Sequence, residues 1–247
     1  MRLDKFLCEM NLGTRSQVKS YVRRGQASVN GVTAVDPQMK IREGMDEVAF
    51  RGQILCYRKN VYYMLNKPAG VVSATRDNTA PTVVSLLKDC GREGLFPVGR
   101  LDKDTEGLLL LTDDGELAHR LLSPRKHVDK TYQVTVERSL ETEDILRLEQ
   151  GVDIGEEKPT LPARVQVLED SVILLTIQEG KFHQVKRMLQ AVNRQVLALK
   201  RVSFGALELD QSLEPGQYRE LTPEEILSLQ DCGDGESSRD RRNGQDA

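Results

Sequence analysis

The sequence contains no tryptophan, only three histidines and four cysteines, and no apolar run long enough to cross a membrane. The cysteines form no CxxC pair and the histidines are scattered, which excludes the usual spacing of a zinc site. The first residues lack the apolar core of a signal peptide. We therefore expect a cytoplasmic protein with reduced thiols, no metal and no membrane contact.

The composition predicts a two-domain globular protein, because 247 residues with 38% hydrophobic and 30% charged side chains exceed one small core. The net charge of -3 is unevenly distributed. Residues 1–59 hold eleven Lys or Arg against six Asp or Glu, whereas residues 203–247 hold four against eleven. Nucleic-acid binding depends on local patches rather than on the sum, so the basic N-terminal segment is a candidate RNA-binding module.

The first 59 residues predict two helices followed by a hairpin. One apolar helical face is formed by Leu3, Phe6, Leu7 and Met10. Ser16 is a candidate N-cap for the second helix, and Asn30-Gly31 is a strong two-residue hairpin turn. The second helix carries four basic residues, Arg15, Lys19, Arg23 and Arg24. These side chains face either plain solvent or a phosphate backbone, and charge alone does not distinguish the two.

Three segments of this module match a known pattern: residues 1–7 (MRLDKFL), 14–17 (TRSQ) and 29–31 (VNG). They resemble the S4 RNA-binding domain. The resemblance implies that the basic helix contacts structured RNA.

The central stretch runs from Gly99 to Gly107 and is followed by four leucines at 108–111. Four leucines are too few to span a membrane and predict a buried strand, which Asp113-Asp114-Gly115 ends with turn-forming residues. The acidic segment before the strand is then placed where a rigid backbone aims a carboxylate into a cleft. The alternative is a solvated acidic loop.

Residues 180–202 contain six Lys or Arg and no Asp or Glu. A helix from about His183 buries Val185, Met188 and Leu189, which leaves Lys186 at the border of the apolar face. Such a lysine either extends to water or lies beside a buried carboxylate, whose ionised form it stabilises. We favour the second interpretation, because segments 102–106 and 180–202 have complementary charge.

The remaining pattern of short strands and isolated helices predicts an α+β fold. Strands are expected at 61–65, 71–73, 130–136, 163–168 and 172–177. Helices are expected at 83–87, 112–122, 140–148 and 223–229. We assign residues 1–59 to the RNA-binding domain, 60–230 to a catalytic domain and 231–247 to a disordered polar tail.

The catalytic segment also matches a known pattern. The matching motifs are residues 63–68 (YMLNKP), 99–102 (GRLD), Thr105, 107–111 (GLLLL), 112–115 (TDDG), 123–125 (SPR), 130–132 (KTY) and 180–188. They resemble the pseudouridine synthases, in particular the RsuA-type branch with an N-terminal S4 domain. The resemblance covers residues 1 to about 229 and implies a mixed, mainly antiparallel sheet with a cleft across its middle.

Position by position, the resemblance makes Asp102 the nucleophile, Tyr132 the ring that stacks on the target uracil, and Lys186 the cation paired with Asp102. Arg100 matches the arginine that enters the space left by the flipped base. His183 and Arg187 are predicted to contact RNA together with the basic helix of the S4 module.

The implied reaction isomerises uridine to pseudouridine in ribosomal RNA by a monomer without metal or other cofactor. The resemblance favours uridine 516 of 16S rRNA. A 23S rRNA uridine is the alternative target, and a non-catalytic rRNA-binding assembly factor is the alternative of another class. A phosphotransferase is a further rival, because Asp102-Lys103-Asp104-Thr105 echoes the DxDx(T/V) loop of haloacid-dehalogenase-type phosphatases, with the threonine one place early.

Overall fold

The computed structural model describes residues 1–43, 45–55, 60–87, 90 and 92–232. The chain forms two compact units, Met1–Lys59 and Asn60–Ala247, which are described separately. The predicted tail falls almost wholly on residues 233–247, outside the described ranges. Within those ranges, no helix is long and apolar enough to cross a membrane.

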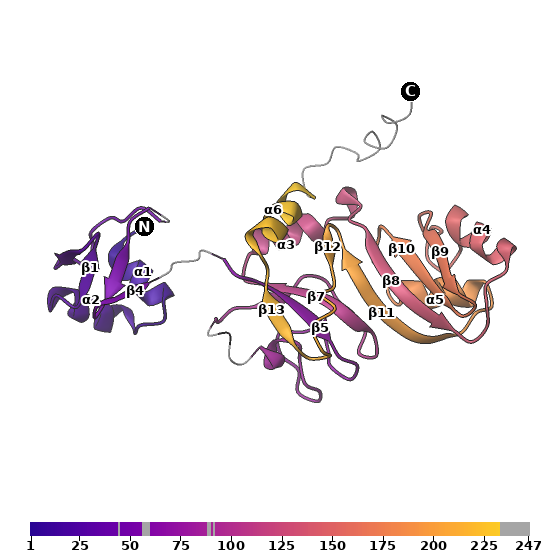
Figure 1. The fold of residues 1–247 in the computed structure, drawn as a ribbon, viewed down its shortest axis with the longest axis horizontal. Coiled ribbons are helices and arrows are strands. Elements are labelled where there is room, and N and C mark those ends of the chain that lie inside the picture. Colours follow the sequence, from indigo (N-terminus) through magenta and orange to yellow (C-terminus); the bar gives the residue numbers. More distant parts are fainter. Residues whose placement is uncertain (44, 56–59, 88–89, 91, 233–247) are drawn as a thin grey trace, which may run out of the picture. The chain divides into compact units, whose positions relative to one another are not determined.

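The N-terminal unit packs two helices against one small sheet (Figure 1). Its elements are α1 (Leu3–Glu9), α2 (Arg15–Arg23), β1 (Ala27–Val29), β2 (Val32–Ala34), β3 (Val48–Phe50) and β4 (Gln53–Leu55), with strand order β2-β1-β3-β4. Asn30 and Gly31 have φ values of 51° and 78°, as the predicted two-residue turn requires. Leu3, Leu7 and Val18 are fully buried, so the helices and the sheet share one core.

The N-cap prediction for α2 was wrong by two residues. Thr14, not Ser16, caps this helix, because the Thr14 side chain accepts from the Gln17 backbone N–H and the Gln17 side chain accepts from the Thr14 N–H. This reciprocal pair satisfies two of the free N–H groups at the helix start.

The second unit is organised around one long sheet of order β13-β5-β7-β11-β8-β10-β9 (Figure 1). Its strands are β5 (Tyr62–Lys67), β6 (Phe96–Pro97), β7 (Glu106–Thr112), β8 (Lys130–Val136), β9 (Arg164–Glu169), β10 (Val172–Ile177), β11 (Val196–Phe204), β12 (Leu207–Glu208) and β13 (Tyr218–Glu220). All named pairings are antiparallel except β7 with β11. The predicted mixed, mainly antiparallel α+β fold is confirmed.

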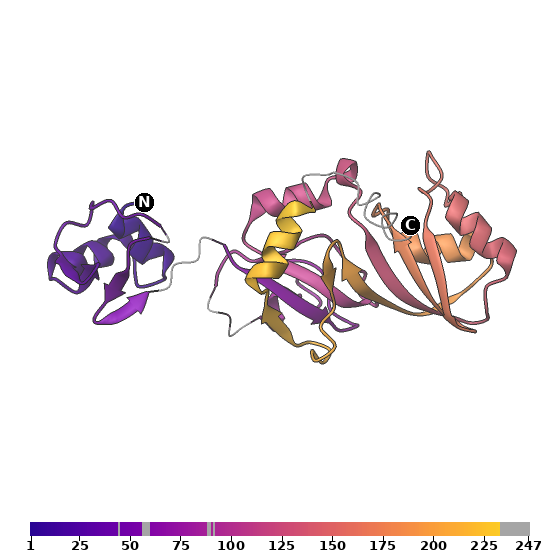
Figure 2. The ribbon, with the colours of Figure 1, turned by 45° about the horizontal axis from the view of Figure 1, so that its top comes forward.

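Helices cover both faces of this sheet (Figure 2). They are α3 (Gly115–Leu122), α4 (Thr142–Gln150), α5 (Gln184–Ala191) and α6 (Pro223–Asp231), with single 3₁₀ turns at Val84–Leu86 and Pro124–Lys126. Leu108 and Leu110 join the core under α3 and α6, whereas Leu109 and Leu111 join the core shared with α4 and α5. The leucine run is therefore continuous because β7 is buried on both faces.

Several elements differ from the predictions. The helix predicted at 83–87 is only a 3₁₀ turn at Val84–Leu86, and α4, β5 and β9 are shifted by one or two residues. Helix α3 starts at Gly115 rather than 112, because Asp114 caps it by accepting from the Glu116 and Leu117 N–H groups. Residues 71–73 form only a single bridge, Val72 to Thr82, instead of a strand. Helix α6 continues to Asp231, one residue beyond the predicted end of the domain.

Candidate active site

The central seam of the sheet is the parallel contact between β7 and β11, where Gly107 lies opposite Arg201. A Cβ atom on Gly107 would lie 2.2 Å from the Arg201 carbonyl oxygen and 2.8 Å from its nitrogen. The φ of Gly107 is +99°, a conformation that other residues rarely adopt. Glycine is required here, and it allows β7 to approach β11 directly after the acidic loop.

The acidic loop that precedes β7 is held in place by the buried side chain of Lys67. This lysine is fully buried, and its Nζ donates to the carbonyls of Pro68 (3.1 Å), Lys103 (3.3 Å) and Thr105 (2.8 Å). The Thr105 N–H donates to the Asp102 carbonyl at 3.1 Å, which closes the turn. The backbone carrying Asp102 is thus fixed by a buried lysine and by a hydrogen bond within the turn.

Ser73 fixes the residue before Asp102. Its Oγ accepts from the Leu101 N–H at 3.0 Å and donates to the Leu101 carbonyl at 2.8 Å. Both contacts cross from the segment after β5, so two distant pieces of chain position the Asp102 carboxylate.

Burial lowers the pKa of Lys67 to about 8 and that of Lys130 also to about 8. Between this value and the ordinary lysine pKa, the unfolded chain binds more protons than the folded one, so stability rises with pH. We expect Lys67 to contribute about 1.5 kcal/mol of added stability between pH 8 and 9.5. The window ends there because burial raises the pKa values of Tyr62 and Tyr63 to about 12. Above the ordinary tyrosine pKa near 10, the folded chain therefore binds more protons than the unfolded one, and these two residues make stability fall as the pH rises.

Urea unfolding at several pH values tests this expectation, with Lys67→Met as the variant. Removal of three hydrogen bonds lowers its stability at every pH, so the slope against pH is the informative quantity. We expect a smaller rise than in the wild type, with the remainder coming from Lys130. An identical rise in both proteins would contradict the assignment.

The acidic loop and helix α5 meet at one pocket, which the predicted catalytic residues line. Asp102 Oδ2 lies 3.4 Å from Lys186 Nζ, and Asp102 Oδ1 lies 3.5 Å from His183 Nε2. Arg100 and Tyr132 line the same pocket. Five residues predicted from the sequence therefore converge, although they come from three separate stretches of chain.

Lys186 is shared between two carboxylates. Its Nζ lies 2.6 Å from Asp104 Oδ1, closer than to Asp102. A hydrogen bond from Lys186 lowers the pKa of Asp104. The Asp104 side chain is 73% exposed against 28% for Asp102, so Asp104 holds the ammonium from the solvent side while Asp102 faces the pocket.

His183 is the N-cap residue of helix α5 and adopts a left-handed conformation, with a φ of 49°. Its ring stacks on Phe182 with centroids 3.7 Å apart. The sharp turn places the imidazole over Asp102 and points the first turn of α5, with Lys186, at the same carboxylate.

Tyr132 lies on β8 and is almost fully buried, with Arg201 as its neighbour on β11. Arg201 Nε donates to the Leu108 carbonyl at 2.8 Å. Burial lowers the pKa of Arg201, an effect that Tyr132 partly offsets. Behind Tyr132, which lines the pocket, lies a buried cation for which no ion pair with a carboxylate is found in the described part of the chain.

Arg187 lies outside this constellation. Its Nη1 pairs with Glu156 at 2.6 Å, and its other donors bind the carbonyls of Phe182 and Ile154. The guanidinium thereby fastens the loop after α4 to helix α5. These contacts give Arg187 a structural role, and its predicted RNA contact stays a prediction. The predicted S4 contacts lie on or beside α2, with Arg15, Arg23 and Arg24 exposed and Lys19 half-buried.

Sequence reasoning missed four supporting residues: Lys67, Ser73, Asp104 and Arg201. Lys67 stood in a recognised motif but had no assigned role. Arg201 shares a strand and a spacing of two with Leu199, so strict alternation would have placed it on the buried face. In the described ranges, no group of three or more His, Cys, Asp or Glu side chains could hold a metal ion.

Comparison with known proteins identifies both units. Residues 1–48 match the S4 domain, and residues 61–191 match the RNA pseudouridylate synthase family. The chain is 49% identical to an uncharacterized RNA pseudouridine synthase, YtzG, of Bacillus subtilis over 93% of this chain and 98% of that protein. It is 42% identical to the ribosomal small subunit pseudouridine synthase A of Yersinia pestis, over 93% and 98%.

A crystal structure of a pseudouridylate synthase, 40% identical in sequence, superposes with a TM-score of 0.66 over 93% of this chain and 99% of that one. These matches exclude the phosphotransferase interpretation of the acidic loop. They leave the assignment of individual site residues to the geometry described above. By family model, sequence identity over nearly the whole chain and fold, the chain belongs to the S4-domain branch of the RNA pseudouridine synthases.

Proposed function

We propose that this protein converts a uridine of ribosomal RNA to pseudouridine and that its target lies in the small-subunit rRNA. One observation carries the proposal: Asp102, Lys186 and Tyr132 line a single pocket despite their distance in sequence. The names of the relatives from Yersinia pestis and Vibrio cholerae, both ribosomal small subunit synthases, support the choice of RNA.

The reaction breaks the bond from N1 of uracil to C1′ of ribose and forms a bond from C5 to C1′. The proton released from C5 is balanced by the proton gained at N1, so no oxidant or energy source is consumed. Asp102 is the nucleophile in this proposal, and Lys186 and His183, at 3.4 and 3.5 Å, orient its carboxylate. Tyr132 offers its ring face to the base.

The target base has to leave its stack to reach Asp102, which costs a few kcal/mol and favours unpaired or distorted RNA. Arg100 is exposed at the pocket edge and is placed to enter the space left by the base. Uridine 516 of 16S rRNA is the proposed site.

Mapping pseudouridine across total rRNA, with and without the gene, tests the proposal. Loss of one 16S modification supports it. Loss of a 23S modification would move the target to the large subunit. Unchanged rRNA in both strains would favour a non-catalytic assembly factor instead.

The S4 helix is proposed to bind the rRNA backbone. We expect the Arg23→Ala, Arg24→Ala double variant to bind rRNA more weakly, because a phosphate that no arginine neutralises keeps its counterions, and their release no longer favours binding. The slope of log affinity against log salt concentration should flatten by about one unit for each phosphate left unneutralised.

Filter binding over a salt series measures this slope. Arg42→Ala is the matched control in the same unit, because Arg42 is already paired with Asp46 at 2.8 Å. Its slope should equal that of the wild type. A double variant with an unchanged slope would show that this face of α2 does not contact RNA.

A further inference from the structure

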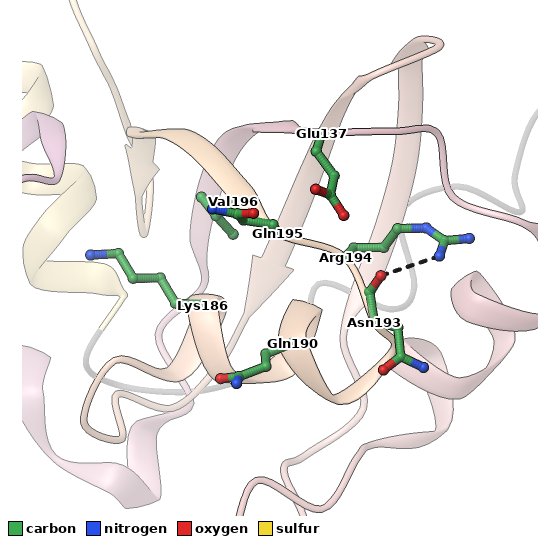
Figure 3. Close-up of a pocket in the computed structure, with 7 residues that line it drawn as sticks. All are labelled: Glu137, Lys186, Gln190, Asn193, Arg194, Gln195 and Val196. Atoms are coloured by element: carbon green, nitrogen blue, oxygen red, sulfur yellow. Dashed lines mark hydrogen bonds between the residues drawn. The ribbon is translucent and has the colours of Figure 1, made fainter.

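A second, larger hollow lies beside the Asp102 pocket. It has a volume of about 530 Å³ and runs from helix α5 to the end of β8 (Figure 3). Lys186 and Gln190 leave α5 one turn apart on one wall, and Glu137, Gln195 and Val196 lie across from that helix. We call it the α5 groove. Lys186 lines both the groove and the Asp102 pocket, so the two hollows adjoin.

Three side-chain amides in the groove have no structural role that the hydrogen bonds of the described residues explain. Gln190, Asn193 and Gln195 are exposed, and in the described part of the chain their amide groups make no hydrogen bond. Each amide carries both donors and an acceptor. Three such groups around one hollow match the edge of a nucleobase better than an apolar ligand.

The charges of the groove argue against a phosphate at its centre. Arg194 is only 7% exposed and is neutralised by Asp144 at 2.5 Å, and Lys186 is held by two carboxylates. Glu137 has only a loose contact with Arg138, at 3.9 Å. A carboxylate of this kind accepts hydrogen bonds from an exocyclic amino group, as on cytosine N4.

A cation that can bind the RNA backbone, Arg138, lies at the edge of the groove instead. Arg138 is 62% exposed and uses one nitrogen to donate to the Asn193 carbonyl at 3.2 Å. Apart from the loose contact of its Nε with Glu137, its exposed guanidinium can meet a phosphate oxygen. The groove therefore combines three amides and one carboxylate with apolar surface that includes Val196, and the Arg138 guanidinium lies at its border.

We propose that the α5 groove binds the base of a nucleotide adjacent to the target uridine, and that this base carries an exocyclic amino group. Sequence-specific RNA recognition acts on unpaired bases whose edges are read by side chains, and base flipping opens the neighbouring stack. In this proposal the groove recognises the base next to the target, whereas the Asp102 pocket binds only the target uracil. This inference rests on the proposed function.

Steady-state kinetics on an rRNA fragment containing the mapped uridine test the groove. Gln190→Ala and Glu137→Gln alter exposed side chains, so both variants are expected to fold. Each should raise KM about tenfold with kcat within twofold of the wild type. Gln166→Ala is the matched control, an exposed amide on the outer strand β9.

The partner base is found by deleting amino groups from the RNA. Adenosine is replaced by purine riboside, guanosine by inosine, and cytidine by its 4-deaminated pyrimidinone analogue, one flanking position at a time. One replacement should raise the wild-type KM about tenfold and have a smaller effect in Glu137→Gln, because the uncharged amide oxygen is a weaker acceptor than the carboxylate.

Unchanged KM in both variants, or equal effects of every replacement in wild type and Glu137→Gln, would overturn the inference. In either case wild-type turnover continues, so the proposed function stands. Absence of turnover by the wild type on any rRNA would instead overturn the proposed function. The groove is then judged by whether Glu137→Gln weakens filter binding of the same fragment.

Discussion

Asp102→Asn is expected to reduce pseudouridine formation to below about 1% of the wild-type rate while RNA affinity stays within about twofold. An amide is nearly isosteric with the carboxylate but cannot act as the nucleophile. Asp102 is anchored through its backbone by Ser73 and Lys67, neither of which the substitution touches. Single-turnover assays and filter binding separate the two effects.

Asp104→Asn is the matched control, and the structure makes it a demanding one. Asp104 lies closer to Lys186 than Asp102 does, at 2.6 Å against 3.4 Å. If proximity to the cation defined the nucleophile, Asp104 would be the better candidate. Because Asp104 is exposed, we expect its variant to retain at least about a tenth of the wild-type rate. A reversed order of losses would transfer the nucleophile to Asp104.

Gly107→Ala is expected to destabilise the catalytic unit by about 2–5 kcal/mol. Left-handed backbone strain contributes about 1–2 kcal/mol and overpacking against backbone about 1–3 kcal/mol. The obstacle is the Arg201 main chain, which cannot rotate aside as a side chain would. We expect a lower urea midpoint by far-ultraviolet circular dichroism, together with loss of activity.

Gly115→Ala provides the control for this measurement. Gly115 begins α3 with an ordinary φ, and a Cβ there would meet nothing within 4 Å. Alanine should leave stability unchanged or raise it by up to about 1 kcal/mol. If Gly107→Ala unfolded at the wild-type midpoint, the seam would have to tolerate a wider strand separation than the structure shows.

Local rules predicted the elements whose causes are local. Asn30-Gly31 determines its own turn, and the leucine run at 108–111 predicted β7 because a strand buried on both faces has to be apolar throughout. The prediction of the α2 N-cap was wrong for an equally local reason. Both Thr14 and Ser16 are good N-caps, and the reciprocal bond with Gln17 decides between them.

The site was predictable only in part, because its partners are set by tertiary contacts. Charge complementarity and family resemblance together predicted that Lys186 lies beside Asp102. They did not show that Asp104 would take the shorter contact, since which carboxylate faces solvent depends on the turn held by Lys67. The sequence also did not show that Arg187, predicted to contact RNA, forms an ion pair with Glu156.

The seam between β7 and β11 also determines when the active site can form. It pairs residues 106–107 with residues 200–201, and such long-range parallel contacts close late in folding because the loop entropy is paid first. Asp102 precedes β7 and Lys186 precedes β11, so the two groups face each other only after this closure. A chain still being synthesised completes its S4 unit early, and it has no catalytic site until β11 has been made and docked.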